Sequence, residues 1–330
     1  MCIICSGEYH GKKNIDIFGC SDLTEIPVII GLENLYCELC DNLIKIASIP
    51  GLKSIAIINC ENLTYISDMP GLEILICNEC SNFEKVPVIT GLRKLDCHGC
   101  TRLTEIPVIH GLKELHCSDC PNIKEIPIIP GLEKLICPDC LNLKEIPNIP
   151  GLKFLVCFRC VNLTKISAII GLTAIDCWHC KNLTEIPNIS GLRKLYCGAC
   201  RYLERIPVIP GLKILNCSSN PRLTEIPVIP GLEELYCEGC PRLTKIHSIS
   251  ELKEFDCFEC PWIEYNDEFK ENLSALITIQ KYIKKYHKLK ICKRWVESDD
   301  FRHWYYHPDG PGGIKAVLRL NNKRLKMNYY

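Results

Sequence analysis

The fold is decided by a stretch of eighteen residues, Leu223-Thr-Glu-Ile-Pro-Val-Ile-Pro-Gly-Leu-Glu-Glu-Leu-Tyr-Cys-Glu-Gly-Cys240. Its pattern returns every twenty residues from about residue 11 to residue 260, without an insertion or a deletion. Glycine stands at residue 31 and at each twentieth residue on to 231, and leucine follows it every time. A fixed period of this size marks a solenoid, in which each unit packs only on its neighbours.

The positions of a repeat are numbered here from this glycine, which is position 1. Positions 5 and 7 are apolar or cysteine, whereas positions 4, 6 and 8 are polar or variable. That alternation predicts a short strand with one buried face, and its regular return predicts thirteen parallel strands side by side. Proline at positions 17 and 20 fixes φ and removes backbone donors, so the return path should be extended and polyproline-like rather than helical. The predicted inward positions are 2, 5, 7, 10, 13, 16 and 19.

Composition narrows the classes of function. The chain has 39 basic and 39 acidic residues, so no net charge attracts nucleic acid or a membrane surface. It contains no run of 18 apolar residues, and its start lacks the basic and apolar regions of a signal peptide. We therefore expect no nucleic-acid binding by the repeats, no membrane span and no secretion. The 26 cysteines are then expected to be reduced thiols.

The repeat resembles a known family. The run Leu-x-x-Leu-x-Cys-x-x-Cys/Asn-x-x-Leu, as in Leu232 to Leu243, is similar to the leucine-rich-repeat signature, and Leu-Thr-Glu-Ile-Pro-x-Ile-Pro resembles its shortest class, known from bacterial effectors. Cysteine at positions 7 and 10, joined to Ile-Pro-x-Ile-Pro-Gly-Leu, looks more like leucine-rich-repeat proteins of giant amoeba-infecting viruses of the mimivirus type. The tail, with Ile279-Gln-Lys-Tyr-Ile-Lys-Lys and Tyr306-His-Pro-Asp-Gly-Pro-Gly-Gly313, also looks like tails of such viral proteins.

This resemblance implies a fold and a function. The expected fold is a leucine-rich-repeat solenoid with a parallel β-sheet on the concave face, an extended convex side and a small α-helical C-terminal domain. The expected divisions are an N-terminal cap at 1–12, the solenoid at 13–260 and a basic, partly helical cap or tail at 261–330. The expected function is non-enzymatic binding of a partner protein on the concave face, in the cytoplasm of an infected host or in the virus particle.

The cysteines admit a metal-binding alternative. Repeated Cys-x-x-Cys is the spacing of a zinc half-site, which would make the chain a zinc-binding protein. However, position 7 changes to isoleucine at Ile17 and Ile57 while position 10 stays cysteine, and position 10 changes to Asn220 while Cys217 remains. Independent substitution favours two packing sites, so we expect no metal and no cofactor. At the N-terminus, Cys2, Cys5 and His10 offer three ligands, but we favour a cap there.

Cysteine also stands beside histidine, in Cys97-His98 and in Cys177-Trp178-His179-Cys180. Adjacent residues of a strand point to opposite faces, so each imidazole should face away from the neighbouring sulfur. His116 has only Asp96 and Asp119 as candidate orienting carboxylates. No set of nucleophile, base and orienting group emerges, and we expect no enzymatic activity.

The predicted exposed positions of the sheet turn apolar around the middle of the array. We take these residues as the candidate partner-binding site: Ile136, Phe154, Val156, Phe158 and Trp178. A smaller apolar group lies nearer the N-terminus: Ala56, Ile58, Ile74 and Ile76. Large apolar side chains grouped on a surface are typical of a binding site. A further alternative is an effector-type adaptor in ubiquitin signalling, although 70 residues with the single Cys292 do not supply a ligase domain.

The chain changes character after residue 260. Apolar residues at helical spacing predict a helix from about Phe269, with its basic side formed by Lys281, Lys284, Lys285 and Lys288. We favour a cap over the last repeat. The alternative is a basic amphipathic helix for an acidic partner, such as a calmodulin-like protein, RNA or anionic lipid.

Overall fold

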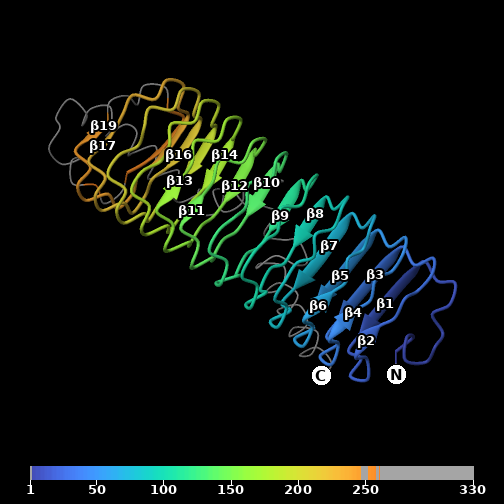
Figure 1. Ribbon diagram of the computed structural model, residues 1–330. Coiled ribbons are helices and arrows are strands. Elements are labelled where there is room, and N and C mark those ends of the chain that lie inside the picture. The colour runs from blue at the N-terminus through green and yellow to red at the C-terminus, as the bar shows by residue number, and fades with distance from the viewer. Residues whose placement is uncertain (1, 247–251, 258–259, 261–330) are drawn as a thin grey trace, which may run out of the picture. The chain divides into compact units, whose positions relative to one another are not determined.

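The structure is a computed structural model that describes residues 2–246, 252–257 and 260. These residues form a leucine-rich-repeat-like parallel β-solenoid of twenty-residue, cysteine-rich turns (Figure 1). The predicted C-terminal helix and its lysines lie outside the described residues. Within the described part, no helix has the length and the apolar character needed to cross a bilayer.

Thirteen strands form one long sheet, as the alternation predicted, and they lie side by side in chain order. Adjacent strands are parallel, and each residue lies opposite the residue twenty positions later in the chain, as Leu35 lies opposite Ile55. The first four are β1 (Asn14–Phe18), β3 (Asn34–Glu38), β5 (Ser54–Ile58) and β7 (Ile74–Asn78). The others are β8 (Lys94–Asp96), β9 (Glu114–His116), β10 (Lys134–Ile136), β12 (Phe154–Val156), β14 (Ala174–Asp176), β15 (Lys194–Tyr196), β16 (Ile214–Asn216), β18 (Glu234–Tyr236) and β20 (Glu254–Asp256).

The core is a stack of identical layers. In the described repeats the residues at positions 2, 5, 7, 10, 13, 16 and 19 are buried. The exceptions lie at the two ends, at the exposed Lys12 and the half-buried Ile246 and Leu252. Leucine and isoleucine fill most of these positions, and the larger Phe83 takes position 13 of its repeat. Each side chain packs on its counterparts in the repeats before and after it, so the apolar face of one turn is covered by the next. The seven inward positions read from the sequence are confirmed.

The glycine at position 1 closes each turn. In the segment from Ile49 to Leu52, the Leu52 N–H donates to the Ile49 carbonyl at 3.3 Å, and Gly51 has a φ of 86°. Proline followed by glycine with positive φ is the central pair of a type II turn. A β-carbon on Gly51 would meet no atom within 4 Å, so glycine is required by the backbone conformation and not by lack of space.

The return path carries short strands only in some repeats: β2 (Glu25–Ile26), β4 (Lys45–Ile46), β6 (Tyr65–Ile66), β11 (Glu145–Ile146), β13 (Lys165–Ile166), β17 (Glu225–Ile226) and β19 (Lys245–Ile246). Among the described residues, these strands pair where the later repeat lacks proline at position 17. That residue is Ala47, Ser67 or Ser167, and in the last of these repeats the sequence has His247, which lies outside the described residues. The N–H groups of Ala47, Ser67 and Ser167 donate to the position-16 carbonyl of the preceding repeat at 3.0–3.1 Å. Proline has no such donor, so elsewhere the path is extended and unpaired.

A ladder of polar contacts runs through the core. From Cys100 onwards, the thiol at position 10 donates to the position-7 carbonyl of the preceding repeat, as Cys120 does to Cys97 at 3.0 Å and Cys140 to Cys117 at 3.0 Å. Where position 10 is Asn220, its amide group donates to the Cys197 carbonyl at 2.9 Å and to the Cys217 carbonyl at 2.8 Å. Its side-chain oxygen accepts from the Cys200 N–H at 2.8 Å. The exchange of cysteine for asparagine therefore keeps the carbonyl of the preceding repeat satisfied.

Candidate functional site

We call the surface formed by the side chains at positions 4, 6 and 8 of the long sheet the open face. These side chains alternate with the buried positions 5 and 7, because successive residues of a strand point to opposite sides. Most of them are half-buried rather than fully exposed. Strands about 4.8 Å apart bring side chains of equal register into contact, so each is partly covered by its two neighbours.

Four of the five predicted partner-binding residues are accessible on this face. Phe154 on β12 is 40 % exposed, and Val156, Phe158 and Trp178 are half-buried. We call these four the apolar patch. Phe154 pairs in register with Ala174 on β14, whose small side chain leaves the phenyl ring open to solvent on that side.

Ile136 differs from the prediction that it is exposed, because only 2 % of it is accessible. It lies in register between His116 on β9 and Val156 on β12, and the next open-face residue of its own repeat, Pro138, is also buried. The side chains of His116 and Val156 on the two adjacent strands thus cover Ile136 and remove it from the surface. It can support the patch from below but offers a partner almost no area.

Trp178 extends the patch over the following repeat. A methyl group added to Gly198 would overlap the indole ring, so the ring lies directly over this glycine. Gly198 does not have a positive φ, so its backbone is one that any residue adopts. Its lack of a side chain is what makes room for Trp178.

An acidic side chain lies among these apolar residues. Asp176 on β14 has Val156 and Tyr196 as its register neighbours, and one of its oxygens accepts from the Trp178 N–H at 3.1 Å. Burial raises the pKa of Asp176 from its usual value to about 6, and this hydrogen bond offsets only part of that effect. Among the residues that the structure describes, no basic side chain forms an ion pair with it. The patch therefore holds an ionised carboxylate at neutral pH without a neutralising partner.

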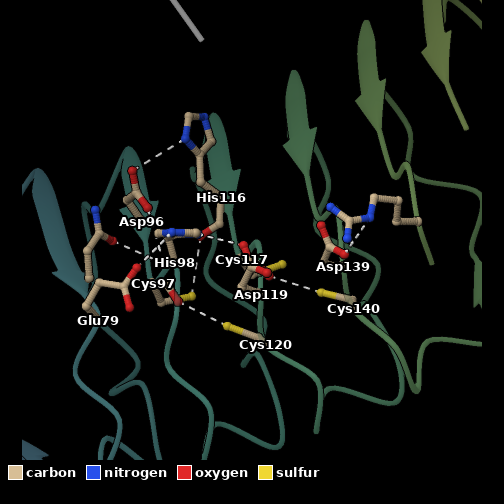
Figure 2. A network of polar contacts seen from close by, with 12 residues as sticks. Glu79, Asp96, Cys97, His98, His116, Cys117, Asp119, Cys120, Asp139 and Cys140 are labelled. Carbon is tan, nitrogen blue, oxygen red and sulfur yellow. Dashed lines mark hydrogen bonds and ion pairs between the residues drawn. The ribbon is translucent and has the colours of Figure 1, made fainter. Parts of the chain in front are cut away.

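A polar cluster occupies the same face in the repeats of β7, β8 and β9, and β10 separates it from the patch (Figure 2). His98 Nε2 lies 3.1 Å from Glu79 Oε1, and its Nδ1 lies 3.5 Å from Asp119 Oδ2. Burial lowers the pKa of His98, but Glu79 and Asp119 outweigh it and raise the pKa to about 8. Glu79 and Asp119 stand at position 9, where the backbone has positive φ and turns the side chain towards the neighbouring strand. The alternation of strand residues gave no sign of this cluster, since position 9 lies beyond the strand.

The histidines of this cluster contact carboxylates and not sulfur. His116 Nδ1 lies 3.4 Å from Asp96 Oδ2, while the buried Cys97 thiol donates to the His116 carbonyl at 3.4 Å. Burial favours protonated Asp96, yet the hydrogen bond from His116 and its charge outweigh this and lower the pKa of Asp96. Cys97 and His98 thus lie on opposite sides of the sheet, as expected for neighbours in a strand. The arrangement orders charge on the surface and pairs no base with a nucleophile.

The smaller apolar group also lies on the open face. Ala56 and Ile58 on β5 and Ile74 and Ile76 on β7 are all half-buried, and Ala56 pairs in register with Ile76. These aliphatic side chains pack on one another along two adjacent strands, and none of them projects as far as Phe154 does.

Thiol clusters are the residues that could hold a metal. The Sγ atoms of Cys2, Cys5 and Cys20 lie within 4.8 Å of one another, and so do those of the buried Cys37, Cys40 and Cys60. The sequence had grouped His10 with Cys2 and Cys5, but His10 is exposed and lies against the ring of Tyr9. Cys20, which the repeat pattern assigned to the core, takes its place.

No protein-family model matches the chain, and no curated protein is similar to it. Among solved structures, the chain is similar to a leucine-rich repeat protein from Bacteroides ovatus, at 14 % sequence identity and a TM-score of 0.42. That match covers 73 % of this chain and 85 % of the other.

Proposed function

We propose that the protein is a non-enzymatic binding module that holds a partner protein on the open face of its long sheet, at the apolar patch. The observation that carries this proposal is the exposure of Phe154 together with Val156, Phe158 and Trp178. Phe154 and Val156 lie on β12, and Phe158 and Trp178 lie in the turns that follow β12 and β14. A folded monomer gains little from large apolar groups on a solvated surface, whereas a few aromatic residues supply most of the binding energy of many interfaces.

The partner that fits this patch is a protein segment with apolar side chains and at least one lysine or arginine. Asp176 lies at the centre of the patch, half-buried and without a cationic partner among the described residues. An isolated carboxylate in apolar surroundings costs stability, and a basic group from a partner would offset that cost. The aromatic rings of Phe158 and Trp178 in the same patch also favour a cation, since the face of an aromatic ring attracts positive charge.

On the sequence resemblance, the setting that we propose is the host cytoplasm or the virus particle. The conclusion about the patch does not depend on it, because the patch is a property of these strands in any compartment. The polar cluster around His98 lies beyond β10 on the same face, so charged side chains follow the patch in that direction.

The test is a selection of ligands from a random peptide display library on the full-length protein. The enriched peptides should combine aromatic or aliphatic residues with a lysine or arginine. Phe158→Ala with Trp178→Ala should weaken binding of these peptides about 30-fold or more, since truncating an aromatic anchor typically costs ~2 kcal/mol. Gly198→Ala should weaken it too, because the added methyl group displaces the Trp178 ring.

Lys94→Ala with Glu234→Ala is the matched control, because both residues lie on the open face at strands β8 and β18, away from the patch. It should leave binding unchanged. If the aromatic double variant binds the selected peptides as well as the wild type does, the patch is not the binding site. If that variant unfolds, its aromatic residues belong to the core. Enriched peptides without a basic residue would contradict the role given to Asp176.

A further inference from the structure

Three cysteine sulfurs meet where the repeats begin. Cys2 Sγ lies 3.6 Å from Cys5 Sγ, Cys5 Sγ lies 3.7 Å from Cys20 Sγ, and the three lie within 4.8 Å of one another. Cys2 and Cys5 come from the turns of residues 2–12, whereas Cys20 is position 10 of the first repeat. Residues far apart in the repeat scheme are thus brought to one point.

The surroundings of Cys20 differ from those of the later thiols at position 10. From Cys100 onwards such a thiol donates to a carbonyl 23 residues earlier, as in the contact of Cys100 with Cys77 at 2.8 Å. Cys20 has no preceding repeat, and its sulfur meets two more thiols instead of a backbone carbonyl. Cys40 and Cys60 donate instead to carbonyls of their own repeats, at Glu38 and Ile58. Cys20 is thus the position-10 residue whose thiol meets the two cysteines of residues 2–12.

The spacing of these sulfurs is that of thiolates around one metal ion. Three thiolates at ~2.3 Å from a tetrahedral zinc ion lie ~3.8 Å apart, close to the two measured separations. Cys2-x-x-Cys5 is also the spacing of a zinc half-site. We propose that Cys2, Cys5 and Cys20 bind one Zn²⁺ ion as three thiolates, with the fourth ligand taken from solvent.

Zinc binding needs no oxidant or reductant, because each thiol releases its proton to solvent as its sulfur bonds to the ion. Three thiolates and Zn²⁺ leave one net negative charge. The ion would join the residues before the repeats to the first repeat, because two ligands belong to the turns and one to the solenoid.

Access distinguishes this cluster from the second one. Cys2 and Cys5 are half-buried, so an ion can reach them from solvent. Cys37, Cys40 and Cys60 are all fully buried, with apolar side chains above and below. A metal site needs a path of entry, and this inner cluster has none. It serves as the internal control.

The experiment uses the full-length protein, reduced and freed of metal, to which Zn²⁺ alone is added. We expect one tightly bound ion per chain in a titration against a chromophoric chelator, and protection of Cys2 and Cys5 from alkylation. Co²⁺ in its place should give thiolate-to-metal charge-transfer absorption. Cys2→Ser and Cys5→Ser should each weaken zinc binding about 100-fold or more. Cys37→Ile should bind as the wild type does and should fold, because Ile17 and Ile57 occupy the same repeat position.

Several outcomes would overturn the proposal. Zinc binding that survives in Cys2→Ser and Cys5→Ser places the ion elsewhere, and binding lost in Cys37→Ile places it at the inner cluster. If the reduced protein binds no Zn²⁺, the proposed zinc site does not exist. The same conclusion follows if the protein retains Cu⁺ but not Zn²⁺. None of these results bears on the apolar patch, since peptide binding is measured at β12 and β14 without added metal.

Discussion

At the scale of single residues, the residue types found at a core position depend on whether the side chain there has to donate a hydrogen bond to a backbone carbonyl. Cysteine at position 10 donates a weak hydrogen bond through its thiol, and asparagine at the same place makes three bonds. The exchange works because an asparagine side chain carries both a donor and an acceptor. Isoleucine replaces cysteine at position 7, where no carbonyl has to be satisfied by the side chain. Each position accepts the residue types whose polar groups match its surroundings.

Asp176 yields a prediction about pH at this scale. The pKa of Asp176 is raised from 3.8 to about 6, so the folded protein holds this proton more tightly than the unfolded chain does. The free energy of unfolding is therefore highest below pH 3.8 and falls as the pH rises through about 6. Asp176→Asn removes the charge and keeps the acceptor, as Asn216 shows by accepting from the Ser218 N–H at 3.1 Å. We expect the variant to be more stable at pH 7 by about 3 kcal/mol, because the shift from 3.8 to about 6 is worth ~1.4 kcal/mol for each pKa unit.

Urea unfolding followed from pH 4 to pH 8 measures this effect. The difference between Asp176→Asn and the wild type should be near zero at pH 4 and should grow through pH 6. A constant difference over the whole range would contradict the shifted titration. The same variant should bind the selected basic peptides less well, so that the carboxylate stabilises the complex while it destabilises the free protein.

At the scale of elements, proline decides which return segments pair. The short strands of the return path form where position 17 of the later repeat keeps its N–H, and they are missing in the described repeats where it is proline. The long sheet has no such interruption, because prolines fall outside positions 3 to 7. The repeat therefore places its prolines where they block pairing on one side of the solenoid and leave the other side intact.

A proline substitution tests this rule. Ser167→Pro removes the N–H that donates to the Ile146 carbonyl at 3.0 Å, and it should cost about 1 kcal/mol and abolish the pairing of β11 with β13. Thr90→Pro is the control, because position 20 is proline in many repeats and is the first central residue of the turn. It should be neutral or stabilising by about 0.5 kcal/mol. Amide hydrogen exchange at residues 144–167 and urea unfolding measure the two effects, and equal losses in both variants would contradict the rule.

At the scale of the whole molecule, each strand of the long sheet that the structure describes pairs only with the strands of the adjacent repeats. Register is the same at every junction, since residues twenty apart are always paired. The apolar patch lies on strands inside this array, so it depends on the repeats beside it and not on those at a distance.

Removal of one complete repeat tests this additivity. Deletion of residues 51–70 joins residue 50 to residue 71 and keeps every position in phase, so the protein should fold and bind the selected peptides unchanged. Deletion of residues 51–60 shifts the following half repeat out of phase and sets polar positions opposite buried ones. It should lose cooperative unfolding and circular dichroism of the native sheet. If both deletions behave alike, the repeats are not independent units.

The sequence by itself determined the features that depend on a single repeat. A period of twenty, the alternation from position 4 to position 8 and the proline pattern predict the parallel strands, the seven core positions and an extended return path. Those features follow from local chemistry, namely which residues point inward and which lack a donor. The paired return segments were missed because the pairing depends on two successive repeats, although the signal at position 17 is present in the chain.

Tertiary structure alone decided what a side chain meets across the stack. Ile136 and Phe154 stand at equivalent kinds of position, yet one is buried between His116 and Val156 while the other lies beside the small Ala174. The carboxylates around His98 converge because the backbone at position 9 turns with positive φ, and Cys20 joins Cys2 and Cys5 because residues 2–12 turn back to the first repeat. Exposure and clustering depend on the sizes and conformations of neighbouring residues in other repeats. The twenty-residue period does not specify those sizes or conformations, so it could not predict them.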